Sequence, residues 1–217
     1  MRYVQRRELI DPDDIVRFAI GWSKTRGVPA PIVEGTVLRV EAGLPDQHQR
    51  YVFTQAPSGM AAVAAGVSAP LIHLKAPIAA DVVRALLPGH WHVEQTGTMM
   101  TLARLPTAQA RLADGYTLTL TEQDGVLAAK IIDPFGAQAA RGLLTIIDGV
   151  ALHDRIIVDE AHRRRGLGKA VMTALGAAAA EHGGRRGILA ATEMGRALYT
   201  KLGWEARSPW TTAQIPN

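Results

Sequence analysis

The chain has 217 residues and 47% of them are hydrophobic, which is enough for one large domain or two small ones with buried cores. Its 24 Lys and Arg exceed its 20 Asp and Glu by a net charge of +4, a modest excess that does not by itself indicate nucleic-acid binding. There is no Cys, so a catalytic thiol, a disulfide framework and a Cys-based zinc site are excluded.

The first half of the chain predicts alternating helices and strands. Asp11 and Pro12 are typical of a helix start, and Gly27 is typical of its end. We then expect strands at 33–40, 51–55 and 71–75, helices at 57–67 and 78–87, and a bent strand or hairpin at 91–105 that is broken at Gly97. The polar segment 106–114 predicts a boundary between an α/β region of residues 1–106 and a domain of residues 107–217.

The second half begins as a meander of strands at 116–121, 126–132, 137–147 and 150–158, with Asp-Gly turns between apolar runs. A helix from Leu167 to about Gly183, a strand at 188–191, a helix at 193–202 and one or two closing strands at 204–215 complete it. The chain therefore predicts an α/β fold with a mixed, mostly antiparallel sheet flanked by helices. Residues 1–14 are too charged for a signal peptide, and residues 170–180 are too few to span a membrane, so we expect a cytoplasmic protein.

A basic, glycine-containing turn joins the strand 150–158 to the helix that begins at Leu167. Three arginines precede Gly166, and Gly168 leaves the backbone open to a ligand. Unpaired amides at a helix start, the positive helix end and nearby cations all favour an anion such as a phosphate. The alternative is a solvated basic turn with no ligand.

Two motifs carry a family resemblance. Arg163-x-x-Gly166-x-Gly168 resembles the Arg/Gln-x-x-Gly-x-Gly/Ala signature of the GNAT superfamily of acyl-CoA-dependent N-acetyltransferases. The stretch from Thr192 through Tyr199 to Gly203-Trp204 resembles that family's Asn-x-x-Ala-x-x-x-Tyr-x-x-x-Gly-Phe stretch. Neither G-x-G-x-x-G nor a Walker-type motif competes with this interpretation. The resemblance covers the chain from about residue 116 to its end.

The resemblance implies that acetyl-CoA, as co-substrate, lies in a V-shaped gap between the strands 150–158 and 188–191. Its diphosphate would sit on the amides of residues 164–169, and its pantetheine would pair with the backbone of residues 156–158 as an added strand does. Thr192 replaces the family's usual Asn, so its side-chain contact to the cofactor is in doubt, although a hydroxyl could replace the amide. The implied cofactor-binding residues are Ile156, Ile157, Val158, Arg163, Arg164, Arg165, Gly166, Leu167, Gly168, Lys169 and Thr192.

Tyr199 matches the family tyrosine that lies near the CoA sulfur, which implies that it protonates the leaving thiolate. The alternative is a half-buried helix tyrosine. His153 and Asp154 interrupt an apolar strand and are the candidates for the general base. Neighbouring strand residues point to opposite faces, so at most one of them faces the gap. Both could instead be polar edge residues, and Arg155 could neutralise Asp154. The other histidines show no metal-ligand spacing, so no metal site is expected.

The two halves share an order of strand, helix, Gly-Trp or Gly-x-Trp, and Thr-rich strand, once at residues 71–105 and once at 188–215. This order predicts that the N-terminal half is a degenerate GNAT-like repeat, although an α/β chain can show it by chance. The first half lacks the glycine turn, so it should hold no cofactor.

The resemblance implies transfer of an acetyl group to the amine of a small molecule by direct attack on acetyl-CoA. The helical segment that the family usually has between its first two strands is missing, so the N-terminal half is expected to wall the acceptor site. The alternatives are a non-catalytic acyl-CoA-binding sensor, a transferase acting on protein amines and, last, a nucleic-acid-binding protein that uses its arginines. A monomer or homodimer without nucleic-acid or membrane partners is expected.

Overall fold

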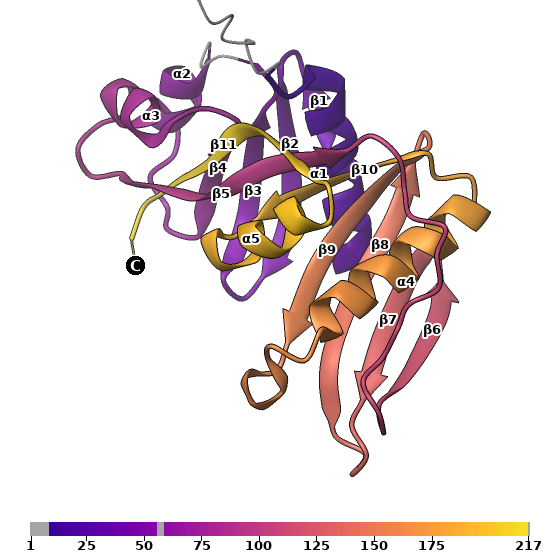
Figure 1. Cartoon of the computed structure of the whole chain (residues 1–217). Coiled ribbons are helices and arrows are strands. Elements are labelled where there is room, and N and C mark those ends of the chain that lie inside the picture. The colour runs from indigo at the N-terminus through magenta and orange to yellow at the C-terminus, as the bar shows by residue number, and fades with distance from the viewer. Residues whose placement is uncertain (1–8, 56–58, 217) are drawn as a thin grey trace, which may run out of the picture.

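The computed structural model describes residues 9–55 and 59–216, and these form one 11-stranded sheet with helices on both faces (Figure 1). The strands are β1 Ile32–Glu34, β2 Val37–Leu44, β3 Gln47–Phe53, β4 Ile72–Ala76, β5 His92–Leu102, β6 Thr117–Gln123, β7 Val126–Ile132, β8 Gln138–Ile147, β9 Val150–Val158, β10 Arg186–Ala191 and β11 Glu205–Gln214. The helices are α1 Pro12–Arg26, α2 Met60–Ala65, α3 Ala80–Leu86, the 3₁₀ turn Glu160–His162, α4 Leu167–Glu181 and α5 Glu193–Lys201. The mixed α/β fold with a flanked sheet is as predicted.

The two halves of the chain exchange their last strands. The sheet order is β1-β2-β3-β4-β11-β5-β10-β9-β8-β7-β6. β11 therefore pairs antiparallel with β4 of the N-terminal half, and β5 pairs antiparallel with β10 of the C-terminal half. The order β3-α2-β4-α3-β5 recurs as β9-α4-β10-α5-β11, and the strand pairs β3–β4 and β9–β10 are both parallel. The topology thus repeats, as the sequence predicted, while the boundary at residues 106–107 stays a prediction.

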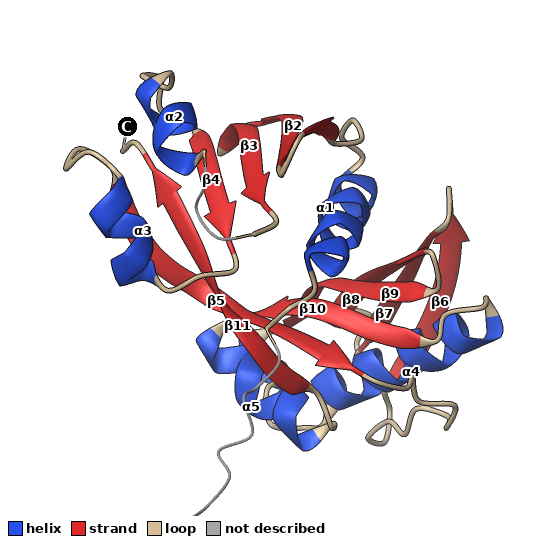
Figure 2. Cartoon of the chain, turned by 90° about the horizontal axis from the view of Figure 1, so that it is seen from above, coloured by secondary structure: helices blue, strands red, loops and turns tan. Residues whose placement is uncertain are grey.

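The sheet bends into two arms, and α1 lies between them (Figure 2). In that view α2 and α3 cover the outer face of the N-terminal arm, and α4 and α5 lie on the outer side of the other arm. The apolar side of α1 joins both arms in one buried cluster, which is made of Ile10, Ile15, Phe18, Ala19, Leu38, Val52, Met99, Val150, Leu152, Ile188 and Trp210. We call the side of the sheet that faces α1 the inner face.

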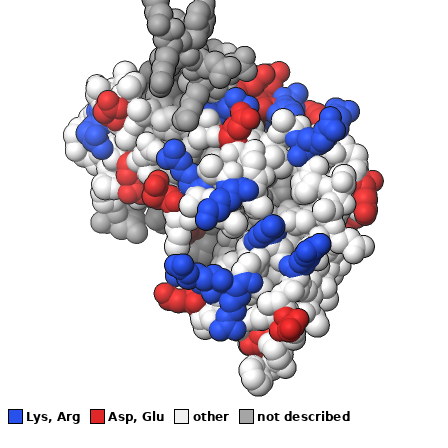
Figure 3. All heavy atoms as spheres, in the orientation of Figure 1, with Lys and Arg blue, Asp and Glu red and all other residues white. Residues whose placement is uncertain are grey.

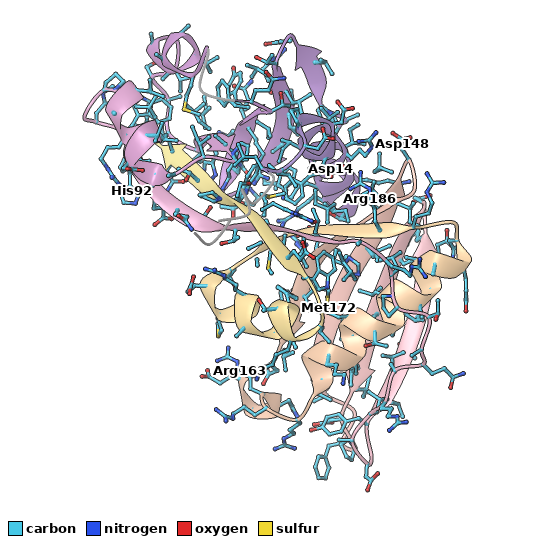
Figure 4. All side chains as sticks on the ribbon, turned by 45° about the horizontal axis from the view of Figure 1, so that its top comes forward. Asp14, His92, Asp148, Arg163, Met172 and Arg186 are labelled. Atoms are coloured by element: carbon cyan, nitrogen blue, oxygen red, sulfur yellow. The ribbon has the colours of Figure 1, made fainter. Side chains whose placement is uncertain are left out.

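Helix α1 is capped at both ends by residues that favour a helix terminus. The Asp11 side chain accepts a hydrogen bond from the Asp13 amide, and Gly27 ends the helix with a left-handed φ of 65°. Near the start, Asp14 accepts two hydrogen bonds from the Arg186 guanidinium of β10, at 2.6 and 2.5 Å (Figure 4). The N-terminal helix is therefore fixed to a strand of the other half.

Several predicted boundaries were wrong for local reasons. Residues 33–40 form two strands because the chain turns at Gly35, whose φ is 66°. The segment 43–49 is mostly strand, since β2 and β3 are joined by a tight turn. The segment 91–105 contains the single strand β5, in which Gly97 is required because a Cβ there would lie 2.6 Å from the Ala191 carbonyl oxygen. Part of the helix predicted at 57–67 lies outside the described residues.

None of the helices within the described ranges is long and apolar enough to cross a membrane.

Candidate active site

β9 and β10 are paired at only one end. Their register covers Arg186↔Val150, Gly187↔Ala151 and Ile188↔Leu152, and beyond these pairs the two strands diverge (Figure 1). Beyond Leu152 on β9 and Ile188 on β10, the facing backbone edges of the two strands therefore form no hydrogen bonds with each other. β3 and β4 of the other half stay paired at four positions, from Gln49↔Ile72 to Val52↔Lys75. The divergence is thus specific to the C-terminal half.

The turn after β9 exposes the start of α4. Arg164 and Gly166 both have left-handed backbone, with φ of 63° and 79°, and Gly166 is the N-cap residue but has no side chain to satisfy the first amides. The first turn of α4 contains no acid. Arg163, Arg164 and Arg165 are exposed, and Figure 3 shows Lys and Arg side chains around this turn and near α5. Uncapped amides, the positive helix end and these cations form an anion-binding arrangement.

A hydrogen-bonded network that the sequence analysis missed holds this turn. The Arg165 Nη1 donates to the Tyr116 hydroxyl at 2.9 Å, and the same hydroxyl is 2.9 Å from the His162 Nδ1. The His162 Nε2 lies 3.6 Å from a carboxylate oxygen of Asp133. The network ties the turn to Tyr116, just before β6, and to Asp133, just after β7. No spacing in the sequence indicates it, because its members lie far apart. Arg163 instead pairs with Glu160 at 3.3 Å.

The start of α4 also lies against α5. A Cβ on Gly168 would meet a Leu198 methyl at 3.0 Å and a Val158 methyl at 3.5 Å. Ile156 and Val158 pack beside α4 on the outer face, and Ile157 is 45% exposed. Lys169 is exposed while Leu167 is buried. Most of the predicted cofactor-binding residues therefore lie around one junction of β9, α4 and α5.

Tyr199 is buried on α5, with its ring centroid 6.3 Å from that of Trp204. Burial raises its pKa to about 12, and the negative charge of Asp154 adds to the increase. The phenol therefore keeps its proton at neutral pH. Thr192 is the N-cap of α5, where its hydroxyl accepts a hydrogen bond from the Gly195 amide at 3.2 Å. The Thr192 oxygen thus already accepts one hydrogen bond, while its hydroxyl proton remains free to be donated to a ligand.

His153 and Asp154 point to opposite faces of the sheet, as their alternation predicts. His153 is only 3% exposed, packs edge-on against Trp204 with ring centroids 5.1 Å apart, and lines a cavity of about 130 Å³ on the outer face with Met172 and Leu202. Burial lowers its pKa to about 4. Its Nδ1 has no hydrogen-bond partner among the described residues. His153 is therefore a neutral, packed side chain.

Asp154 faces α1 instead. It accepts a hydrogen bond from the Thr25 hydroxyl at 2.9 Å and two from the Arg26 guanidinium at 3.2 and 3.3 Å. The expected partner, Arg155, is exposed at a strand irregularity with a φ of 52°, so Arg26 replaces it as the ion-pair partner. Asp154 lies just past the last β9–β10 pair, where the two strands diverge.

Known families and structures agree with this geometry. Residues 114–206 match the family model described as an acetyltransferase (GNAT) domain. No curated protein matches the sequence. A GCN5-related N-acetyltransferase from Kribbella flavida has a TM-score of 0.67 at 15% identity, over 94% of this chain and 96% of that one. One from Sphaerobacter thermophilus has a TM-score of 0.57 at 12% identity, over 97% and 95%.

A tandem GNAT protein from the clavulanic acid biosynthesis pathway has a TM-score of 0.55 at 16% identity, over 83% of this chain and 79% of that one. At these identities the three structures show similarity of fold alone. The similarity to a tandem GNAT protein agrees with the repeated topology of the two halves. The resemblance that the two sequence motifs predicted is confirmed for the C-terminal half.

Proposed function

Because residues 114–206 match the family model of a GNAT acetyltransferase domain, we propose that the chain transfers an acetyl group from acetyl-CoA to the amine of a small molecule. One observation carries this proposal: the uncapped start of α4 opens beside the point where β9 and β10 diverge. A helix start with free amides suits a diphosphate, and an unpaired strand edge suits the amide groups of pantetheine.

The residues around the turn suit the charge and shape of acyl-CoA. The amides of residues 164–169 and the exposed arginines would hold the diphosphate. The β9 backbone at residues 156–158 would pair with pantetheine, and Thr192 would contribute its hydroxyl proton. Acyl-CoA itself supplies the thioester that is attacked.

Asp154 and Tyr199 supply the proton transfers in this proposal. Asp154 accepts the proton that the acceptor ammonium loses, so that the free amine can attack the thioester carbonyl carbon. A C–N bond forms and the C–S bond breaks, and Tyr199 gives its proton to the leaving sulfur. The attacking nitrogen then loses its second proton as it becomes an amide, and this proton restores the Tyr199 hydroxyl, directly or through water. Burial first, and the charge of Asp154 second, raise the pKa of Tyr199, so that the phenol holds its proton until the sulfur leaves. His153, the other candidate base, is less suited because it is buried on the face toward α4, and its lowered pKa of about 4 makes it a weak base.

Calorimetric titration with acetyl-CoA tests the proposal. Wild type should bind with micromolar affinity, which is about −8 kcal/mol, and Arg164→Glu should weaken binding by reversing an exposed charge at the turn. Gly168→Trp should abolish it, because the new ring would occupy the junction with Leu198. Gly89→Trp is the control, since a Cβ there meets nothing within 4 Å.

A panel of amines then separates an enzyme from a sensor, with free CoA thiol as the readout. An enzyme releases thiol in proportion to an added amine, whereas a sensor binds acetyl-CoA without turnover. Equal binding to wild type and to both turn variants would refute the assigned acyl-CoA site.

A further inference from the structure

The inner face of the N-terminal arm contains two buried cations. Arg50 on β3 and Lys75 on β4 are each only 8% exposed. Arg50 Nη2 donates to the Gln47 side-chain oxygen at 2.7 Å, and Lys75 Nζ donates to the Thr212 hydroxyl at 2.5 Å. Within residues 9–55 and 59–216, neither cation forms an ion pair with a carboxylate. Buried cations are ordinarily paired, because burying an isolated charge is costly.

The register places these cations on one face. Arg50 lies opposite His73, and Val52 lies opposite Lys75. Since side chains two apart in a strand share a face, Arg50, Val52, His73 and Lys75 all point the same way. Val52 packs in the cluster with α1, whereas the intervening Leu74 belongs to the core under α2 and α3. The cations therefore point to the side of the sheet on which α1 lies.

Hydrogen-bond donors on this face are left unfilled. Arg50 Nε and Gln47 Nε2 are buried and have no partner among the described residues. His73 Nδ1 has none there either, and it is a donor in the tautomer that carries the proton on this nitrogen. Burial and, to a lesser extent, the nearby charge of Arg50 lower the pKa of Lys75 to about 7. Burial likewise lowers the pKa of Arg50 to about 9. An anion at this place would satisfy the donors and balance the charge.

A row of contacting side chains on the inner face links the two cations to the candidate active site. The Arg50 guanidinium lies 3.5 Å from the centroid of the Trp22 ring, and the Arg26 guanidinium lies 4.9 Å from the same ring. Arg26 in turn binds Asp154. A ligand that reached from Asp154 to Lys75 would therefore lie along α1 and the bent sheet.

We propose that the acceptor is an amino-carboxylate whose anionic group binds at Arg50 and Lys75 while its amine lies at Asp154. The proposal rests on the proposed function and adds the substrate class. It assigns the degenerate half a role in binding the acceptor rather than the cofactor, which agrees with the continuous pairing of β3 and β4.

The test uses the full chain and two matched series of probes. One series is the unbranched ω-amino acids from glycine to 6-aminohexanoate, and the other is the alkylamines of the same lengths. Binding is followed by calorimetry, with and without CoA, and turnover is followed by thiol release from acetyl-CoA. The length series measures the spacing between the amine and the carboxylate positions.

The variants are Lys75→Met, which keeps the length of the side chain but removes its charge, and Lys75→Arg, which restores a cation. Lys130→Met, on an exposed strand position, is the matched control. The amino acids should bind wild type more tightly than the alkylamines, and Lys75→Met should weaken their binding about tenfold or more. Lys75→Arg should recover most of it, and acetyl-CoA binding should be unchanged in all three variants.

The two proposals fail differently. If acetyl-CoA binds but amino acids bind no better than alkylamines, or if Lys75→Met binds them as wild type does, the amino-carboxylate proposal is overturned and the acyltransferase proposal stands. If acetyl-CoA does not bind, the proposed function fails. Amino-acid binding that depends on Lys75 would still identify an anion site on this face.

Discussion

Arg26 and Asp154 are 128 positions apart in the sequence, yet the Arg26 guanidinium donates two hydrogen bonds to the Asp154 carboxylate. Arg26 ends the first helix of the N-terminal half, and Asp154 lies on β9 where the C-terminal half opens. The pair therefore brings a group from each half to the place where we expect the chemistry. A change in the position of the α1 C-terminus would therefore change the hydrogen bonds of Asp154 directly.

Asp154→Asn should lower kcat about 10²–10⁴-fold, because an amide cannot accept the proton of the acceptor ammonium. The affinity for acetyl-CoA should be unchanged, since Asp154 faces α1 and not the basic turn. Asp148→Asn is the control, as its carboxylate is 75% exposed and forms a long ion pair of 3.6 Å with Arg17. Steady-state kinetics at saturating acetyl-CoA measure the effect, and an unchanged kcat would remove Asp154 from the mechanism.

Tyr199→Phe should keep the ring that packs against Trp204 and lose only the proton donor, so kcat should fall while the melting temperature changes little. Because the pKa of Tyr199 is raised to about 12, its proton is retained across the usual assay range. Wild-type activity should therefore show no loss attributable to this group between pH 7 and pH 10. Tyr51→Phe, in the other half, is the control. A variant with full activity would assign the leaving-group proton to another donor.

His153→Phe should be tolerated, because phenylalanine keeps the edge-on contact with Trp204 and removes a nitrogen that makes no hydrogen bond to any described residue. The pKa of His153 is lowered to about 4 in the folded chain. As pH falls, the His153 imidazole is therefore protonated near pH 6.5 in the unfolded chain but only near pH 4 in the folded chain. The wild type loses stability as pH falls through this window, by at most about 3 kcal/mol from this group.

Urea unfolding between pH 4 and pH 7 measures this change, and His153→Phe should show a flatter profile than wild type. Its thiol-release activity should remain, since we assign the base to Asp154. Loss of activity with an intact fold would restore His153 as the candidate base.

Lys75→Met should stabilise the protein at pH 6–7 by about 1–4 kcal/mol, because it removes a buried charge that has no carboxylate partner within residues 9–55 and 59–216. Burial is the main cause that lowers the pKa of Lys75 to about 7. The charges of Arg50 and Arg26 also lower it, and that of Glu94 raises it. Between pH 7 and pH 10.5 the unfolded chain binds the proton and the folded chain does not, so wild-type stability rises with pH. The advantage of the variant should shrink over that range.

Thermal unfolding from pH 6 to pH 10 measures this difference, with Lys130→Met as the control that should follow wild type. A destabilised Lys75→Met protein at pH 6 would mean that the lysine has a counterion in the folded chain.

Local features of the sequence predicted much of the candidate site. Gly166 and Gly168 after an apolar strand indicated the turn, and the alternation of a strand predicted that His153 and Asp154 face opposite ways. Their partners could not be predicted, because Arg26 and Trp204 reach them only through the tertiary fold. The burial of Lys75 could not be predicted either, because a lysine in a short strand is usually exposed. It becomes evident only when the position of β4 in the sheet is known.

The exchange of β5 and β11 bears on how the chain folds as it is made. β11 is the last strand in the sequence, and it fills the position between β4 and β5. Until residues 205–214 have left the ribosome, β4 has an open edge and the N-terminal arm lacks a strand. The first half therefore cannot reach its native sheet during synthesis, even though it emerges first. The sheet of the first half can be completed only after β11 has been synthesised, and this long-range pairing favours slow folding of the two halves as one unit.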